Sequence, residues 1–257
     1  MFAKLKCFVG SLLLRFSCFM SSPPPPLTLL GKTIVITGAN SGIGFAAAKA
    51  LAQRGAHVIL ACRDLYSAEK AKERILYSLP NASIASQNIE VKPLDLSDLE
   101  SIRAFATNIS VCDVLINNAG IMLNTSHRSN NNDINLTMRT NHLGPFLLTN
   151  LLLPAMRKTA LNNNCECRII NVASRLEKVA KLIEEVPVLS WLLPSESSSS
   201  PSPLSGLTLY ANSKLCNLLM TFELHRRLRR EENKEIITVN AMTPGKYLPV
   251  HSKHCKL

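Results

Sequence analysis

The stretch that most constrains the fold of this chain covers residues 32–44, KTIVITGANSGIG. A short run rich in β-branched residues, Thr33–Thr37, predicts a strand, and the alanine-rich segment 45–53 predicts a helix. The loop between them has glycines at positions 38, 42 and 44. A helix N-terminus offers unpaired N–H groups and the positive end of the helix dipole, and glycine lets a phosphate approach the backbone. This order therefore predicts a phosphate site, although the G-x-x-x-G-x-G spacing differs from the G-x-G-x-x-G of most dinucleotide folds.

Strand-like and helix-like segments then alternate along the chain at the pace of a doubly wound parallel sheet. Residues 126–133 are expected to form a polar surface loop, and the low-complexity run 195–203, SESSSSPSP, is expected to be disordered. A length of 257 residues suits one α/β domain with a substantial core. The sequence thus predicts a Rossmann-type α/β fold in a single domain. Further strands are expected at 56–61, 89–94, 111–116, 168–172 and 236–241. Helices are expected at 67–79, at 98–109 with Ser97 as N-cap, at 134–160 with a kink or break at Pro145 and Pro154, and at 209–232.

The first 20 residues, MFAKLKCFVGSLLLRFSCFM, predict a targeting or anchor segment. They are basic and apolar, and no acidic residue occurs before Asp64. A membrane anchor is the preferred interpretation, although Arg15 leaves the apolar run short of the ~20 residues that a span requires. A mitochondrial presequence and an interfacial helix are the alternatives. Residues 21–26, SSPPPP, predict a stiff spacer before a domain at 27–257.

The net charge of +11 does not indicate a nucleic-acid groove. The densest basic run, 225–230, contains a leucine and is followed at once by Glu231 and Glu232, which is typical of the solvated end of a helix. Aromatic residues make up only 5% of the chain, too few for a base-stacking platform. The eight cysteines are scattered without zinc spacing, so we expect reduced thiols, no metal site and no nucleic-acid partner.

Two charged residues, Arg63 and Asp64, follow the second predicted strand. In a dinucleotide fold this position faces the adenosine ribose, where an acid bonds the 2′-hydroxyl and an arginine accommodates a 2′-phosphate. Because Arg63 comes first, the sequence favours NADP (NADPH) over NAD as the cofactor. The structural alternative is an arginine that only ends a strand.

Tyr210 and Lys214 are four residues apart in a predicted helix, so their side chains share one face. A phenol with a pKa near ~10 is a poor base at neutral pH, and an adjacent ammonium group favours its phenolate. Such a tyrosine can exchange a proton with a carbonyl or alcohol while a nicotinamide exchanges hydride. The pair follows a glycine loop, an N-N-A-G strand end and a strand-terminal serine, in that order.

In this combination the chain resembles the short-chain dehydrogenase/reductase family, in the subgroup of the retinol dehydrogenases and the oxidoreductase domain of the WW-domain-containing oxidoreductase. The resemblance covers about residues 30–245. The matching motifs are TGANSGIG (37–44), ACRD (61–64), DLS (95–97), NNAG (117–120), NHLG (141–144), NVAS (171–174), YANSKLCN (210–217) and TPG (243–245).

The resemblance implies four catalytic residues. Tyr210 would be the proton donor or acceptor, and Lys214 would bind the nicotinamide ribose and lower the pKa of the tyrosine. Ser174 would hold the substrate oxygen, and Asn141 would support a water-linked proton path to the lysine. Asp95 would lie near the adenine and Asn117 beside the cofactor. The implied cofactor-binding set is Thr37, Gly38, Asn40, Ser41, Gly42, Ile43, Gly44, Arg63, Asp95, Leu96, Asn118, Ala119, Gly120, Tyr210, Lys214, Pro244 and Gly245.

The expected function is that of an NADP-dependent oxidoreductase acting on a lipophilic alcohol or carbonyl, such as a retinoid, at the endoplasmic reticulum membrane or in the mitochondrion. A homodimer is a further expectation from the family. The sequence after Gly245, KYLPVHSKHCKL, does not resemble the family, so we expect the last strand and the C-terminal substrate-binding elements to be lacking. The alternative function is therefore a truncated, inactive chain that retains nucleotide binding and acts as an interaction protein.

Overall fold

The computed structural model describes residues 28–79, 88–123, 128–129, 132–180, 205–230 and 236–244. The expected anchor at 1–20, the spacer at 21–26, the low-complexity run 195–203 and the residues from Gly245 onward lie outside the described residues. The expectations about those segments therefore stay predictions.

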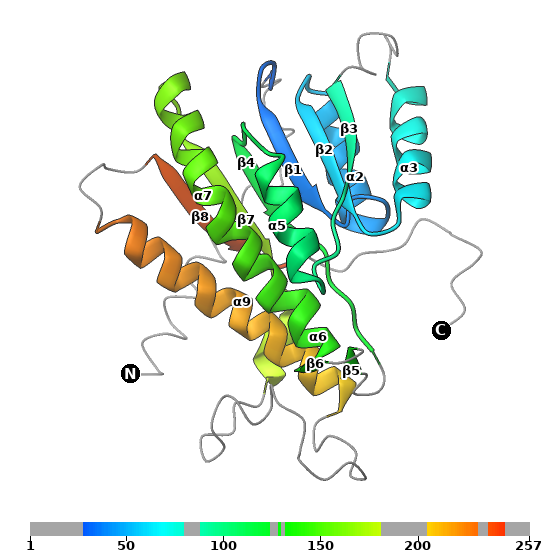
Figure 1. Cartoon of the computed structure of the whole chain (residues 1–257), viewed down its shortest axis with the longest axis vertical. Helices are drawn as coiled ribbons and strands as arrows, with labels where there is room; N and C mark the ends of the chain where they lie inside the picture. Colours follow the sequence, from blue (N-terminus) through cyan, green and yellow to red (C-terminus); the bar gives the residue numbers. More distant parts are fainter. Residues whose placement is uncertain are drawn as a thin grey trace.

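A six-stranded sheet forms the centre of the fold (Figure 1). Its strand order is β3-β2-β1-β4-β7-β8, and every neighbouring pair is parallel. The chain builds outward from β1 to one edge and then from β4 to the other, so the topological switch point lies between β1 and β4. The predicted doubly wound sheet is confirmed, with strands β1 (Thr33–Thr37), β2 (His57–Cys62), β3 (Ile89–Pro93), β4 (Val114–Asn117), β7 (Cys167–Val172) and β8 (Ile237–Met242).

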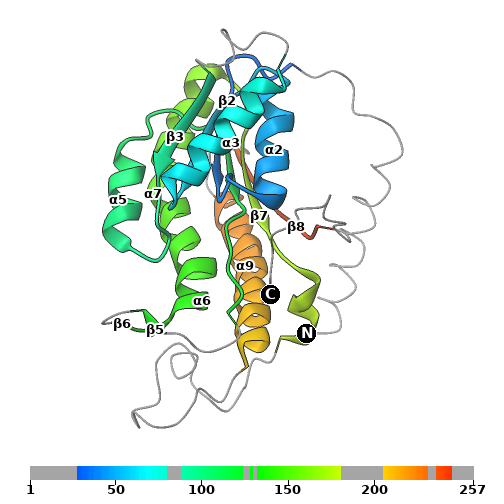
Figure 2. The same ribbon diagram turned by 90° about the vertical axis from the view of Figure 1, so that its right-hand side faces the viewer.

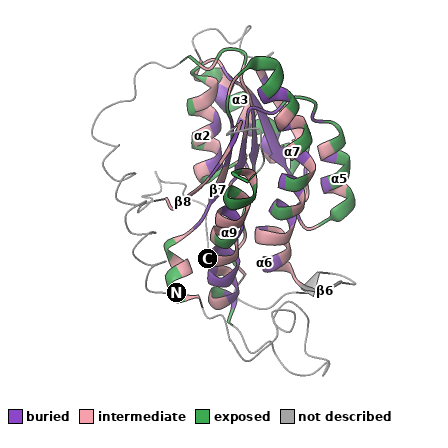
Figure 3. Cartoon of the chain, turned by 90° about the vertical axis from the view of Figure 1, so that its left-hand side faces the viewer, coloured by how far each residue is buried: buried purple, intermediate pink, exposed green. Residues whose placement is uncertain are grey.

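Helices cover the sheet in two layers. Helices α2 (Gly42–Ala52) and α3 (Leu65–Tyr77) pack on one face, while α5 (Leu99–Thr107), α7 (Gly144–Asn163) and α9 (Gly206–Leu228) pack on the other (Figure 2). Successive residues of β1 point to opposite faces, so its apolar run is buried on both sides. The sheet interior and the inner sides of the helices are accordingly buried (Figure 3). Each fully buried Ile or Leu side chain contributes about 1.5–3 kcal/mol to folding.

Several helices begin earlier than predicted, among them α3 at Leu65 instead of 67 and α9 at Gly206 instead of 209. Helix α2 begins at Gly42, three residues before the predicted start, because the glycine turn itself forms its first turn. The N-cap of α5 is Asp98, whose side chain accepts a hydrogen bond from the N–H of Glu100, and not Ser97. Ser97 instead donates both its N–H and its hydroxyl to the carboxylate of Asp95.

Two short antiparallel strands lie where a loop was predicted at 126–133: β5 (Arg128–Ser129) and β6 (Asn132–Asn135). Strand β6 also takes up residues 134–135, which were predicted to begin a helix. Only two residues separate these strands in the sequence, a spacing that suits hairpin pairing. The polar composition therefore concealed a small two-stranded element.

The predicted helix at 134–160 consists of three pieces. They are α6 (Leu136–Met138), a π-helical turn η3 (Arg139–Leu143) and α7. Pro145 stands in the first turn of α7, and α7 continues through Pro154 without ending there. A π turn widens the helix and leaves backbone groups out of the ordinary α-helical pattern. Here the widened turn contains Asn141, one of the four predicted catalytic residues.

Candidate active site

The site is built where β1 and β4 end at the topological switch point. The hydroxyl of Thr37, the last residue of β1, accepts hydrogen bonds from the N–H groups of Asn118 and Ala119, each at 3.0 Å. The side-chain amide of Asn118 donates to the carbonyls of Thr37 at 2.9 Å and Gly38 at 3.2 Å. Asn118 was predicted as a cofactor contact, and its amide nitrogen serves to fasten the glycine turn to the end of β4.

The glycine turn needs glycine for two reasons. Gly38 and Gly42 have φ angles of +63° and +54°, a region that other residues rarely adopt. A Cβ on Gly38 would lie 3.0 Å from Ala119, and a Cβ on Gly44 would overlap the Asn118 amide and the Gly38 carbonyl. The turn is thus pressed closely against the residues that follow β4.

The start of α2 fits an anionic group. Its N-cap, Ser41, makes no side-chain capping bond, and its first turn holds no acidic residue. Asn40, Ser41, Gly42 and Ile43 are exposed or half-buried here. An uncapped helix N-terminus presents free N–H groups and the positive end of the dipole, which suits the pyrophosphate of a dinucleotide.

The end of β2 separates the two charges that compete for the ribose. The Asp64 carboxylate is the N-cap of α3 and accepts hydrogen bonds from the hydroxyl and the N–H of Ser67, which hold the pKa of Asp64 below its usual range. Arg63 is exposed. Both side chains are exposed, and the Asp64 carboxylate already accepts two hydrogen bonds within α3.

Asp95 and Leu96, predicted to lie near the adenine, follow β3. The Asp95 carboxylate accepts from the N–H and hydroxyl of Ser97, so it holds its own loop in shape. Leu96 is buried, and its carbonyl lies so close to Gly144 that a Cβ at position 144 would overlap it. The β3 loop is thereby pressed against the start of α7.

The predicted catalytic residues come together at the carboxyl ends of β4 and β7. The Tyr210 side chain lies beside that of Ser174, whose hydroxyl favours the ionised phenol and so acts to lower the pKa of Tyr210. The Lys214 ammonium lies 5.6 Å from the centre of the Tyr210 ring and donates to the Val172 carbonyl at 2.9 Å. Three residues from two separate elements therefore meet as the sequence predicted.

Asn141 completes the group from the π turn. Its Oδ1 accepts from the N–H of Ile121 at 2.8 Å, and its Nδ2 donates to the Ile121 carbonyl at 2.9 Å and to Ser213 Oγ at 3.1 Å. A Cβ added to Gly120 would lie 3.2 Å from Lys214 Nζ and 3.5 Å from Asn141 Oδ1. Gly120 therefore leaves the space in which the lysine and the asparagine converge.

One electrostatic expectation was wrong for this arrangement. Burial raises the pKa of Tyr210 above its ordinary value, against the opposing effect of the Ser174 hydrogen bond. The Lys214 ammonium points to the Val172 carbonyl, and burial lowers the pKa of Lys214 to about 8. Burial thus shifts both groups toward their neutral forms, and Lys214 contributes nothing to lowering the pKa of Tyr210 in this arrangement.

A buried polar chain beside the catalytic group was not predicted. Asn117 Nδ2 donates to Thr149 and to Asn171 Oδ1, and Asn171 Nδ2 donates to Thr221. Thr221 donates to the carbonyl of Asn217. Asn117 was predicted to lie beside the cofactor, but its amide nitrogen is hydrogen-bonded within this polar network. The residues of the network occupy strand and helix positions that the hydrophobic pattern alone would assign to the core.

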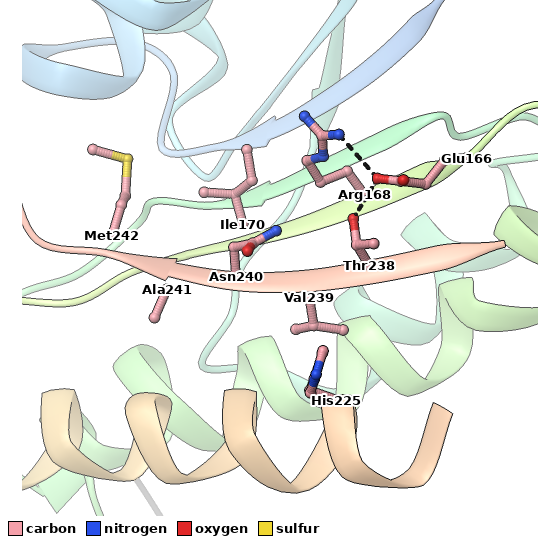
Figure 4. A pocket seen from close by; sticks show the side chains of 9 residues that line it. All are labelled: Glu166, Arg168, Ile170, His225, Thr238, Val239, Asn240, Ala241 and Met242. Atoms are coloured by element: carbon pink, nitrogen blue, oxygen red, sulfur yellow. Dashed lines mark hydrogen bonds and ion pairs between the residues drawn. The ribbon is translucent and has the colours of Figure 1, made fainter. Parts of the chain in front are cut away.

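A hollow of about 490 Å³ lies apart from this group, along β7 and β8 (Figure 4). One part of its wall is the ion pair of Arg168 with Glu166. The Glu166 carboxylate also accepts a hydrogen bond from the hydroxyl of Thr238. Met242, at the end of β8, is 38% exposed. None of the predicted catalytic residues lines this hollow. Pro244, which was predicted to contact the cofactor, follows β8 and lies at the same end of the sheet as Ser174.

One protein family has this combination of a glycine turn, polar strand ends and a Ser–Tyr–Lys group. Its profile, described as short chain dehydrogenase, matches residues 32–183. The chain belongs to the short-chain dehydrogenase family. It is 38% identical to retinol dehydrogenase 13 of Homo sapiens over 226 residues, which are 86% of this chain and 61% of that protein. It is also 38% identical to the short-chain dehydrogenase TIC 32 B, chloroplastic, of Brassica napus, over 83% of this chain and 63% of that protein.

Solved structures give the same result. An uncharacterised protein from Mycobacterium Paratuberculosis is 35% identical with a TM-score of 0.69, over 88% of this chain and 71% of that one. A metagenomic short-chain oxidoreductase in complex with NADP is 26% identical with a TM-score of 0.60, over 85% of this chain and 84% of that one. The chain spans less than two thirds of the length of the two curated relatives named above. No helix among the described residues is both long and apolar enough to cross a membrane.

Proposed function

We propose that this chain is an NADP-dependent oxidoreductase that interconverts a lipophilic alcohol and the corresponding carbonyl compound. The observation that carries the proposal is the meeting of Tyr210, Ser174 and the buried Lys214 ammonium, which lies 5.6 Å from the centre of the tyrosine ring. Bound NADP(H) would supply or accept the hydride. In the reducing direction, Ser174 would orient the substrate oxygen and Tyr210 would give it a proton.

The choice of NADP rests on Arg63 and Asp64. A carboxylate that already accepts two hydrogen bonds from Ser67 is a poor partner for a ribose 2′-hydroxyl, whereas an exposed guanidinium suits a 2′-phosphate. The free N–H groups at the start of α2 would hold the pyrophosphate.

The lipophilic substrate class rests on three exposed apolar side chains close in sequence to the catalytic residues. Met122 is 54% exposed and follows Gly120 by two residues, Val179 is 56% exposed and follows Ser174 by five, and Leu207 is 50% exposed and precedes Tyr210 by three. Exposed apolar side chains this near in sequence to the predicted site residues would suit a substrate with a long hydrocarbon part.

The proposal is tested by mixing the purified full-length chain, in mild detergent, with NADPH and either retinal or a medium-chain aldehyde. Loss of NADPH absorbance that depends on the aldehyde would support the proposal, and a matched run with NADH should be slower. Binding of NADPH without turnover would favour the alternative of a nucleotide-binding interaction protein.

We further propose membrane association through residues 1–20, at the endoplasmic reticulum or the mitochondrion, and a homodimer. A fluorescent protein carrying residues 1–26 tests the first, since a diffuse cytosolic signal would contradict both targeting alternatives. Sedimentation of the full chain tests the second.

A further inference from the structure

Asn217 connects the catalytic helix to the π turn. It follows Lys214 by three residues on α9 and is 6% exposed. Its Nδ2 donates to the backbone carbonyl of Asn141 at 2.8 Å, and its Oδ1 lies 2.9 Å from Nδ1 of His142. One buried amide therefore contacts two successive residues of the π turn that contains the catalytic asparagine.

Pro145 removes the donor that the carbonyl of Asn141 would have in an α-helix. In an α-helix, the carbonyl of residue 141 accepts from the N–H of residue 145, and proline has no N–H. The chain thus lacks the ordinary partner for this carbonyl, and the Asn217 amide supplies a donor from another helix. A buried carbonyl left without a partner would cost free energy and would favour a different turn geometry.

The orientation of the amide also fixes the ring of His142. A carbonyl can only accept, so Nδ2 of Asn217 must face Asn141 and Oδ1 must face His142. Nδ1 of His142 then carries a hydrogen and donates it to Oδ1. Burial lowers the pKa of His142, so the neutral Nδ1–H tautomer is the form that this arrangement requires at neutral pH.

We infer that Asn217 is a positioning residue that sets the place of Asn141 relative to Lys214. The side chain of Asn141 reaches Ile121 and faces Lys214 across Gly120, so a rotation of its backbone would move its amide away from the lysine. Asn217 touches neither substrate nor cofactor in this inference and acts only through the turn. The inference rests on the proposed function, because its effect is measured on turnover.

Two variants separate the bonds of Asn217. Asn217→Leu has a similar shape and removes both bonds. Asn217→Asp keeps the acceptor for His142, and its carboxyl can donate to the Asn141 carbonyl only while protonated. Thr159→Val is the matched control, because Thr159 is equally buried and accepts from the N–H of Cys112 at 3.2 Å, at the opposite end of the sheet.

The experiment measures kcat for each NADPH-binding site, together with the Kd of NADPH and the thermal midpoint. We expect kcat to fall by about 10- to 100-fold in Asn217→Leu, with the Kd changed less than threefold, since small displacements of catalytic groups cost rates of this order. In Asn217→Asp, kcat should recover as the pH is lowered, because the protonated carboxyl again donates to Asn141. Equal loss of stability in Asn217→Leu and Thr159→Val, with kcat per site unchanged in both, would overturn the inference.

A second readout does not need turnover. In the chain labelled with ¹⁵N-histidine, His142, assigned by its loss in His142→Gln, should show a protonated Nδ1 that is lost or averaged in Asn217→Leu. If the wild-type chain binds NADPH and turns over no aldehyde, the proposed function fails. The inference about Asn217 is then decided by the ¹⁵N signal of the His142 ring. An unchanged His142 pattern in Asn217→Leu would overturn it.

Discussion

The ammonium group of Lys214 donates a hydrogen bond of 2.9 Å to the backbone carbonyl of Val172. This bond joins α9 to the end of β7, two residues before Ser174, and so brings the lysine, the serine and Tyr210 into one group. The residue Lys214 is 3% exposed, and this burial lowers the pKa of its ammonium group to about 8. The bond therefore shapes the site, and the burial of the ammonium makes the stability of the fold depend on pH.

Lys214 should make the chain more stable as the pH rises from 8 to 9. The folded pKa of about 8 lies below that of a free lysine, so the unfolded chain binds more protons in this range and the free energy of unfolding increases with pH. We expect a gain of about 1 kcal/mol over this step, absent in Lys214→Met. Urea unfolding of both proteins at pH 8 and pH 9 measures the difference. Parallel pH dependence in the two would contradict the shifted lysine.

Gly120→Ala should impair catalysis more than folding. The added methyl group would lie 3.2 Å from Lys214 Nζ, so the ammonium must shift by a few tenths of an ångström, while Asn141 Oδ1 at 3.5 Å stays in ordinary contact. We expect kcat to fall by about tenfold or more while the thermal midpoint changes little. Steady-state kinetics with a melting curve check this, and a variant with wild-type kcat would show that the space over Gly120 is not needed.

The fold and much of the site could be predicted because their signals are local. The apolar run of β1 with its glycines, and the spacing of Tyr210 and Lys214, each lie within a few residues. The π turn around Asn141 and the buried chain through Asn217 could not be predicted, because they depend on contacts between segments about 70 residues apart. Pro145 gave a partial signal, since it marked an irregular helix without showing what replaced the missing N–H.

The pKa of Tyr210 was mispredicted for a physical reason. The i, i+4 spacing places Lys214 on the same face as the tyrosine, but only the folded structure shows how far the site is removed from water. Desolvation then outweighs the attraction of a cation that is itself directed at a carbonyl.

Lys32→Met should destabilise the chain strongly. Lys32 donates to the Asp113 carboxylate at 2.9 Å, and Asp113 is 1% exposed and also accepts from the N–H of Thr33. Removing the partner leaves a buried charge, and because Lys32 itself is partly exposed we expect a loss of about 2 kcal/mol. The pair Lys92–Glu90 is the matched control because its carboxylate is 43% exposed, so Lys92→Met should cost less than about 1 kcal/mol. Urea unfolding compares them, and equal losses would show that the burial of Asp113 has no special effect.

Arg63→Gln should weaken NADPH binding by about tenfold or more and leave NADH binding nearly unchanged, since only NADPH carries the 2′-phosphate. Arg54→Gln is the control for the loss of one positive charge, because Arg54 is also exposed but precedes β2, whereas Arg63 follows it. Titration of both cofactors by fluorescence measures the four affinities. A loss of the same size for NADH would mean that Arg63 does not recognise the phosphate.

The most direct test of the account is the single-turnover reduction of retinal by the NADPH-bound chain, compared with Tyr210→Phe. The hydroxyl of Tyr210, beside Ser174, is the proposed proton donor, so its removal should lower the rate by at least about 100-fold while the affinity for NADPH stays within about threefold. If Tyr210→Phe reduces retinal at the wild-type rate, the proposed role of the Ser174–Tyr210–Lys214 group is wrong.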